Sequence, residues 1–285
     1  MNDLVSAYLK LDRTDECILH AIFRNMWDFE YVPSHAITRE CNLNEEKLEI
    51  FLRKLSGLGM IENKYHEYIG ASFTFKGLSV FSLKRLVRRN VVSMLGKILG
   101  EGKESVVFNA LNDTGDEFAV KFHRVGYPSF KKVREKRDYG TLHYTVLTVR
   151  SARREFQALR RLYGYASVPR PIAWEGNAVV TELVDARELY RIRLENPEDV
   201  LEMIVDEIRK MFSRGIVHGD LSQFNILAAE DGIWIIDFPQ YVEADAEGAE
   251  KILLRDVRNV LEYFRKAYGV KKDLNEVAEY IRGKA

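Results

Sequence analysis

The sequence predicts an α+β protein, with an N-terminal winged helix followed by a larger two-lobed domain. Three observations predict this organisation. Residues 1–80 show apolar residues at helical spacing and then two short strand-like runs. Residues 92–122 contain strand-like runs separated by glycines. Residues 201–238 contain an apolar helical stripe and then short apolar runs that end in polar side chains.

The first region, residues 1–82, has the helix-then-hairpin pattern of a winged helix. Thr14 precedes two acidic residues, which is typical of a helix N-terminus. Residues 60–63 and 71–75 have the pattern of two strands around a tip that contains Gly70. The apolar face of the first long helix consists of Ile18, Leu19, Ile22 and Phe23.

A second long helix is expected at residues 45–57, with Asn44 as its N-cap. Its outward positions carry both acidic and basic residues and form no uniformly basic face. Two interpretations therefore remain open, binding in a nucleic-acid groove and docking on a protein. Residues 83–95 are expected to form a linker helix. Its basic residues, which fit an amphipathic linker as well as a nucleic-acid contact, are Lys84, Arg85, Arg88 and Arg89.

The smaller lobe is expected at residues 96–184 and begins with a glycine-containing turn, Gly100-Glu-Gly-Lys-Glu-Ser105. Glycine lets a backbone approach phosphate closely, and Lys103 and Ser105 would add a cation and a hydroxyl. Because Gly100 and Gly102 join two strands and open no long helix, the pattern is not that of a dinucleotide-binding fold. An ordinary hairpin turn is the alternative.

Lys121 lies among apolar neighbours in a strand-like run, where its charge needs an anionic partner. In enzymes that transfer phosphate from ATP, such a lysine contacts the α and β phosphates and pairs with a helical glutamate. Glu155 is the candidate partner, with a plain surface glutamate as the alternative. Between the two, residues from about 124 to 145 form a highly charged insert that we expect to be mobile. Ser129 lies at its tip and is a candidate phosphoacceptor.

A strand expected at residues 179–184 ends the smaller lobe. Its position in the chain places the backbone near Glu182 and Val184 where it would bind adenine. A helix over residues 201–212 then leads into the larger lobe, residues 185–285.

The larger lobe carries the most specific pattern in the chain. A run from His218 to Asn225 reads His-Gly-Asp-Leu-Ser-Gln-Phe-Asn, and Ile235-Ile-Asp-Phe238 follows. This spacing places Asp220, Asn225 and Asp237 at the ends of apolar segments. Kinases use the same arrangement, in which one aspartate faces the acceptor and the other two groups hold Mg²⁺ against ATP. Phosphoryl transfer is therefore the leading hypothesis.

Taken together, these motifs resemble the RIO-type atypical serine/threonine protein kinases. The resemblance rests on the glycine turn, the Lys-Lys-Val-Arg-Glu-Lys-Arg-Asp-Tyr-Gly140 run, the His218–Asn225 run and Ile236-Asp-Phe-Pro-Gln240. The winged helix makes the chain similar to the second RIO subfamily in a short archaeal-type form. This resemblance implies a two-lobed protein-kinase-like fold, ATP with Mg²⁺ or Mn²⁺, autophosphorylation in the insert, and a role in small ribosomal subunit maturation.

The resemblance also implies roles for the matching residues. Asp220 is implied to be catalytic, and Asn225 and Asp237 are implied to bind the metal. The residue matching Asp237 is further implied to accept phosphate transiently, as an aspartyl-phosphate. The nucleotide contacts expected from the motifs and the resemblance together are Gly100, Gly102, Lys103, Ser105, Lys121, Glu155, Glu182 and Val184.

The chain differs from ordinary protein kinases after Asp237. Pro239 stands where they have a glycine, the next helix is expected near residues 247–264, and no Ala-Pro-Glu motif follows. The sequence therefore predicts that an activation loop and a platform for peptide substrates are absent. An ATPase switch, or a kinase with few targets, fits this better than a broad protein kinase.

Two other functions remain open. Aminoglycoside and choline kinases share the His-Gly-Asp…Asn and Ile-Asp-Phe patterns, although a winged helix and a basic insert would not help to bind a small alcohol. An rRNA- or ribosome-binding module with a nucleotide switch is the third hypothesis. It is favoured by residues 121–161, which carry 12 Lys and Arg against 3 Asp and Glu in a chain of zero net charge.

Composition narrows the remaining classes. The 285 residues are 46% hydrophobic and 30% charged, which is typical of a globular protein. No apolar run reaches about 18 residues, so we expect no membrane span, and the first residues lack the pattern of a secretory signal. Cys17 and Cys41 have no metal-ligand spacing, and we expect no disulfide. We expect a cytoplasmic monomer without a specific DNA site, whose partner is the pre-small-ribosomal-subunit particle with its rRNA and ribosomal proteins.

Overall fold

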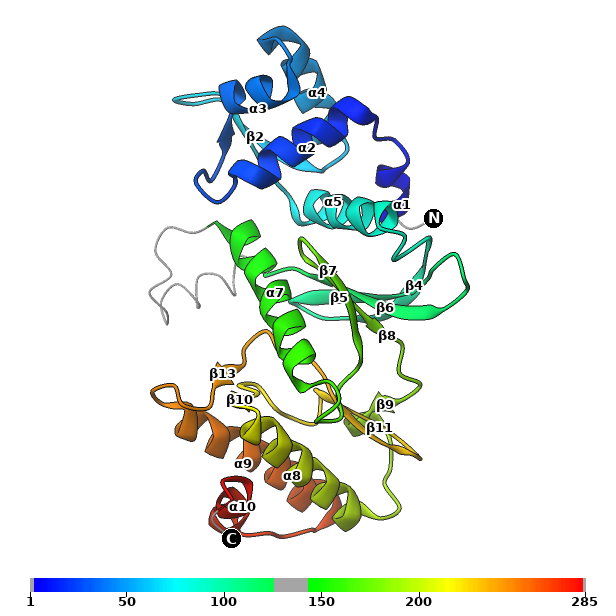
Figure 1. Cartoon of the computed structure of the whole chain (residues 1–285), viewed down its shortest axis with the longest axis vertical. Coiled ribbons are helices and arrows are strands. Elements are labelled where there is room, and N and C mark those ends of the chain that lie inside the picture. The colour runs from blue at the N-terminus through cyan, green and yellow to red at the C-terminus, as the bar shows by residue number, and fades with distance from the viewer. Residues whose placement is uncertain (1–2, 126–142, 284–285) are drawn as a thin grey trace. The chain divides into compact units, whose positions relative to one another are not determined.

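The computed structural model describes residues 3–125 and 143–283, and Figure 1 shows its elements. The chain divides into two compact units. Unit 1 contains residues 1–152 and 173–180, and unit 2 contains residues 153–172 and 181–285. Most of the predicted insert, including Ser129, lies outside the described residues.

The first part of unit 1 confirms the predicted winged helix. Strand β3 lies between β1 and β2, antiparallel to both. Helix α4 has the bounds that the sequence predicts, and Asn44 Oδ1 accepts a hydrogen bond from Lys47 N at 2.9 Å. The elements are α1 (Asp3–Tyr8), α2 (Arg13–Asn25), β1 (Val32–Pro33), α3 (Ser34–Cys41), α4 (Glu45–Gly57), β2 (Ile61–Lys64) and β3 (Gly70–Phe73).

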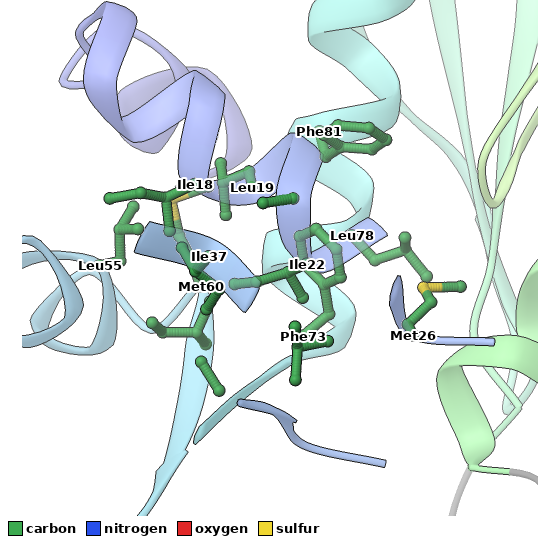
Figure 2. Close-up of a cluster of buried hydrophobic side chains, with 14 of the residues drawn as sticks. Ile18, Leu19, Ile22, Met26, Ile37, Leu55, Met60, Phe73, Leu78 and Phe81 are labelled. Atoms are coloured by element: carbon green, nitrogen blue, oxygen red, sulfur yellow. The ribbon is translucent and has the colours of Figure 1, made fainter. Parts of the chain in front are cut away.

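One hydrophobic core holds these elements together. Figure 2 shows side chains from the helices and from the wing meeting in it. On the inner face that the sequence predicts for α2, Ile18, Leu19 and Ile22 are buried and Phe23 is partly buried. Burying each large apolar side chain contributes roughly 1.5–3 kcal/mol. The labelled members are Ile18, Leu19, Ile22, Met26, Ile37, Leu55, Met60, Phe73, Leu78 and Phe81.

The predicted start of α2 was wrong by two residues. Asp12 is the N-cap, because its carboxylate accepts from the N–H groups of Thr14 and Asp15 at 2.8 and 3.0 Å. The Asp15 carboxylate in turn accepts from Asp12 N at 2.9 Å, which completes a capping box. Thr14 and the acidic residues after it therefore form the first turn, where negative charge is favoured.

The expectation of unpaired cysteines was also wrong. Cys17 of α2 and Cys41 of α3 form a disulfide, with a Cα–Cα distance of 5.7 Å. Helix α2 packs on α3 and so brings together two residues that lie 24 apart in the chain. Their sequence spacing carries no trace of this packing, and that is why sequence analysis missed the pair.

Helix α5 (Phe75–Arg88) follows the wing, with Thr74 as its N-cap. It begins earlier and ends sooner than the linker helix expected at residues 83–95, because its first turns are buried against the winged helix. A five-stranded sheet comes next, in the order β4-β5-β6-β8-β7. Its strands, with helix α7, are β4 (Met94–Glu101), β5 (Ser105–Leu111), β6 (Glu117–His123), α7 (Tyr144–Leu162), β7 (Pro171–Glu175) and β8 (Ala178–Glu182).

Unit 2 is mainly helical, with two small sheets. Strand β11 lies between β12 and β9, and β10 pairs antiparallel with β13. Among the helices of the described residues, none is both long enough and apolar enough to cross a membrane. The elements after β8 are β9 (Arg187–Glu188), η1 (Leu189–Arg191), α8 (Pro197–Ser213), β10 (Ile216–Val217), β11 (Ile226–Ala229), β12 (Gly232–Ile235), β13 (Val242–Glu243), α9 (Ala249–Tyr268) and α10 (Leu274–Ile281).

Candidate active site

The loop between β10 and β11 carries Asp220, and His218 fixes its conformation. The imidazole is buried, with Nε2 2.9 Å from Ile236 O and Nδ1 3.2 Å from Asp220 N. Because a carbonyl only accepts and a backbone N–H only donates, these partners place the proton on Nε2. His218 therefore ties the residue before Asp237 to the backbone of Asp220.

Gly219 is held from the other side by α9. Its φ is +85°, and a Cβ at this position would lie 2.2 Å from Gln240 O, so only glycine fits. Its N–H donates to Asp256 Oδ2 at 2.7 Å, and its carbonyl accepts from Arg255. Burial raises the pKa of Asp256, and the bond from Gly219 opposes part of that rise. The loop is thus clamped at the residue before Asp220.

Asp220 itself keeps contact with solvent. Partial desolvation raises the pKa of its carboxyl above the usual range. The negative charge of Asp237 reinforces this rise. A carboxylate with a raised pKa is a stronger base, which suits a group that accepts a proton from a hydroxyl or from water.

Asn225 and Asp237 are brought together by the β11–β12 hairpin. Ile226 pairs with Ile235, and just beyond this pair the Ile236 N–H donates to Asn225 O at 3.0 Å. Asp237 then has a φ of +71°, in the left-handed region that few non-glycine residues adopt. Such backbone strain is concentrated at functional sites.

The side chains of Asn225 and Asp237 suit a magnesium ion. Asn225 Nδ2 donates to Asp220 O at 2.8 Å. This bond identifies which side-chain atom of Asn225 is nitrogen, and it leaves the amide oxygen pointing away from Asp220 O. That oxygen and the Asp237 carboxylate are hard donors of the kind that Mg²⁺ takes alongside water and phosphate. Within residues 3–125 and 143–283 no group of three or more His, Cys, Asp or Glu forms a metal site.

The segment after Asp237 is short and anchored. Arg154 Nε donates to Pro239 O at 3.3 Å, and its Nη2 donates to Tyr241 O. The guanidinium also lies 4.6 Å from the centre of the Tyr241 ring. Strand β13 follows at once and α9 begins at Ala249, so the structure bears out the predicted lack of an activation loop.

The predicted phosphate-binding residues of unit 1 lie on three adjacent strands. The turn between β4 and β5 is closed by a bond from Gly102 N to Ser105 O of 2.9 Å, and Arg124 donates to Gly102 O at 2.7 Å. A Cβ at Gly100 would meet no atom within 4 Å, so packing does not require glycine there, whereas room for a ligand would. Lys121, half-buried, pairs with Val107 across β5 and β6.

The other predicted nucleotide contacts belong to unit 2. Glu155 is buried on α7. The Glu182 side chain accepts from Arg170 N at 2.8 Å, and the Glu182 N–H donates to Arg170 O at 3.0 Å, so of its two backbone groups only the carbonyl oxygen remains for adenine. The proposed pairing of Lys121 with Glu155, and the adenine contacts of Glu182 and Val184, stay predictions.

Sequence analysis missed three residues that build the site, namely Arg154, Arg255 and Asp256. Asp256 had a readable signal, because it is an acid within the apolar stripe that Leu253 and Val257 define on α9. The two arginines had none, since each lies among other charged residues.

Comparisons with known proteins agree with this geometry. The RIO domain family matches residues 106–277, and the Rio2 N-terminal domain family matches residues 8–89. The RIO-type serine/threonine-protein kinase Rio2 of Methanocaldococcus jannaschii is 33% identical over 268 residues, which cover 88% of this chain and 98% of that protein. Serine/threonine-protein kinase rio2 of Dictyostelium discoideum is 32% identical, over 90% of this chain and 51% of its own length.

A solved structure is similar as well. The Rio2 kinase of Chaetomium thermophilum, described as an ADP/Mg²⁺-phosphoaspartate complex, has a TM-score of 0.82 and 26% identity, and the match covers 96% of this chain and 88% of that one. The chain therefore belongs to the RIO family of serine/threonine-protein kinases and carries the N-terminal domain of the Rio2 type.

Proposed function

We propose that the chain binds ATP with Mg²⁺ or Mn²⁺ and transfers the γ-phosphate to a serine or threonine hydroxyl, its own Ser129 included, or to water. The observation that carries this proposal is the clamped loop, which presents Asp220 next to the Asn225–Asp237 pair. Catalysis in such a site comes mainly from positioning and from electrostatic stabilisation.

The proposal gives each residue of the site a task. Asp220 orients the acceptor hydroxyl and takes up its proton. Asn225 and Asp237 would hold the metal ion, which neutralises charge on the β and γ phosphates when it is bound. Lys121 would position the α and β phosphates, and the turn from Gly100 to Ser105 would cover them. In an ATPase cycle, an oxygen of Asp237 would attack the γ-phosphorus, ADP would leave, and water would hydrolyse the aspartyl-phosphate.

We propose the pre-small-ribosomal-subunit particle as the partner of a cytoplasmic monomer. The positive charge of residues 121–161 supports a polyanionic partner such as rRNA. The winged helix gives little support for specific DNA reading, because two of the three α4 cations, Arg53 and Lys54, are engaged within the chain. Arg53 pairs with Glu49 at 2.7 Å, and Lys54 pairs with Asp12 at 2.9 Å. A small-molecule substrate has no structural observation in its favour.

The test uses the purified full chain with Mg²⁺ and γ-labelled ATP, and follows free phosphate and label on the protein. Acid-stable label that is lost in Ser129→Ala and in Asp220→Ala establishes serine kinase chemistry. Free phosphate with only hydroxylamine-sensitive label, lost in Asp237→Asn, establishes an ATPase that works through aspartyl-phosphate. A matched control is Ser213→Ala, at the end of α8, which should behave like the unaltered chain. Absence of both products would refute the proposal for the isolated protein.

A further inference from the structure

A buried polar joint lies within unit 1, between α5 and the turn that connects β7 to β8. Asn177, in that turn, is fully buried. Its Nδ2 donates to Ser79 Oγ at 3.0 Å and to His123 O at 2.7 Å. Its Oδ1 lies 2.8 Å from the Ser82 hydroxyl, and its N–H donates to the same hydroxyl at 3.1 Å. One side chain therefore bonds at once to α5 and to the end of β6.

Close backbone approach makes the joint specific. Gly176, the residue before Asn177, has a φ of +51°, and a Cβ there would lie 2.3 Å from Ser82 Oγ. The tip of the turn thus rests directly on α5. Every polar atom of the Asn177 side chain has a partner, as a polar group buried this deeply requires.

An ion-pair cluster attaches the same turn a second time. Glu175, whose side chain is 10% exposed, accepts from Arg85 Nε and from Arg89 Nη1, the latter at 2.8 Å. Arg85 of α5 and Arg89, the C-cap residue that follows it, therefore clamp one carboxylate of β7. With Asn177, this fixes the turn against α5 at both of its ends.

The joint also fixes the end of the strand that carries Lys121. His123 N donates to Asn177 O at 2.8 Å, so both backbone groups of His123 bond to Asn177. Farther along, Val125 N donates to Thr148 Oγ1 at 3.1 Å. Lys121 precedes His123 by two residues on the same face of β6, a distance of roughly 7 Å. A displacement of His123 would therefore also displace Lys121.

We infer that Asn177 is a positioning residue for Lys121, and that α5 is a structural part of the nucleotide site. Asn177 transfers the position of α5 to the end of β6, and so sets where the Lys121 ammonium meets the phosphates. The inference rests on the proposed role of Lys121 in nucleotide binding. It gives the N-terminal region a task in the kinase reaction besides partner binding.

A double-mutant cycle on the full chain tests it, with isothermal titration of a non-hydrolysable ATP analogue in the presence of Mg²⁺. Asn177→Ala should raise the dissociation constant about tenfold, which is the size of one lost buried hydrogen bond. Lys121→Ala should raise it as well. The double variant should bind like Lys121→Ala alone, because Asn177 acts through the lysine. A purely structural asparagine would instead give additive losses.

Controls separate the outcomes. Ser213→Ala removes a hydroxyl that bonds Lys210 O at 2.7 Å on α8, and it should leave the dissociation constant unchanged. Ser79→Ala removes one bond of the joint and should weaken binding by a smaller factor, so the idea stays testable if Asn177→Ala does not fold. Normal affinity in folded Asn177→Ala, or additive losses in the cycle, would overturn the inference. Normal affinity in Lys121→Ala would instead remove the role of Lys121 on which it rests.

Discussion

Asp256 is the residue whose substitution tests the architecture of the catalytic loop most directly. Its side chain is buried, and Oδ2 accepts the Gly219 N–H at 2.7 Å while Oδ1 lies 3.1 Å from Arg255 Nη2. Asp256→Ala would leave that N–H buried without an acceptor. Losing a bond to a charged group costs about 1.5–3 kcal/mol, so we expect the free energy of unfolding to fall by about 2–3 kcal/mol.

Activity should fall further than stability alone predicts. Gly219 precedes Asp220, and its released backbone would let the carboxylate of Asp220, the proposed catalytic group, move, so we expect kcat to fall by about 10- to 100-fold at saturating ATP. Asp256→Asn keeps an oxygen acceptor of the same shape, and it should retain most of the stability and activity. Urea denaturation and steady-state phosphate release measure the two effects. A folded Asp256→Ala variant with unchanged kcat would refute the clamp, and equal damage in Asp256→Asn would show that charge matters more than the acceptor.

Other substitutions probe the rest of the site and the fold. Asp237→Asn should lower metal-dependent turnover by orders of magnitude with little change in melting temperature, and turnover like that of the unaltered chain would remove its role. The pKa of Asp220 is raised, so the loss of kcat/KM on acidification should set in at a higher pH than it would for an ordinary aspartate, whose pKa is near 3.9. Asp237→Asn removes the neighbouring negative charge and should lower the pKa of Asp220, as carboxyl NMR would show. Arg154→Lys keeps the charge but loses the planar guanidinium that bonds both Pro239 O and Tyr241 O. Because these bonds anchor the segment that follows Asp237, the substitution should raise the Mg²⁺ concentration needed for half-maximal turnover. Reducing Cys17–Cys41 should lower the free energy of unfolding by about 3 kcal/mol, and a native thiol titration that finds two free thiols would contradict the disulfide.

Local patterns in the sequence predicted the elements that local chemistry determines. Helix α4 was predicted with its bounds and its Asn44 cap, because capping and apolar spacing are both readable within a few residues. The group of Asp220, Asn225 and Asp237 was predicted from the spacing of these residues at the ends of apolar segments, and the β11–β12 hairpin does bring Asn225 next to Ile236. Spacing along two short strands was enough for this.

Features that depend on distant packing were missed. The Cys17–Cys41 disulfide follows from the packing of α2 on α3, and the clamp on Gly219 follows from the packing of α9. The N-cap of α2 at Asp12 was missed for a different reason, since Thr14 and the acidic residues after it also satisfy the rules for a helix start. The disulfide and the clamp on Gly219 leave no periodic signal in the sequence. The one exception is Asp256, the acid in the apolar stripe of α9.

The anchored segment after Asp237 limits how this kinase can be controlled. Arg154 holds Pro239 and Tyr241, and Ala244 N donates to Gly215 O at 3.0 Å. Arg161 pairs with Glu243 at 2.6 Å as β13 pairs with β10. These contacts hold the segment in one conformation, whereas phosphorylation of an activation loop selects between two. In the proposed ATPase cycle, the state of Asp237, free or carrying phosphate, would be the variable that remains at this site. A regulator of that cycle would act on the rate at which phosphate arrives at Asp237 or leaves it.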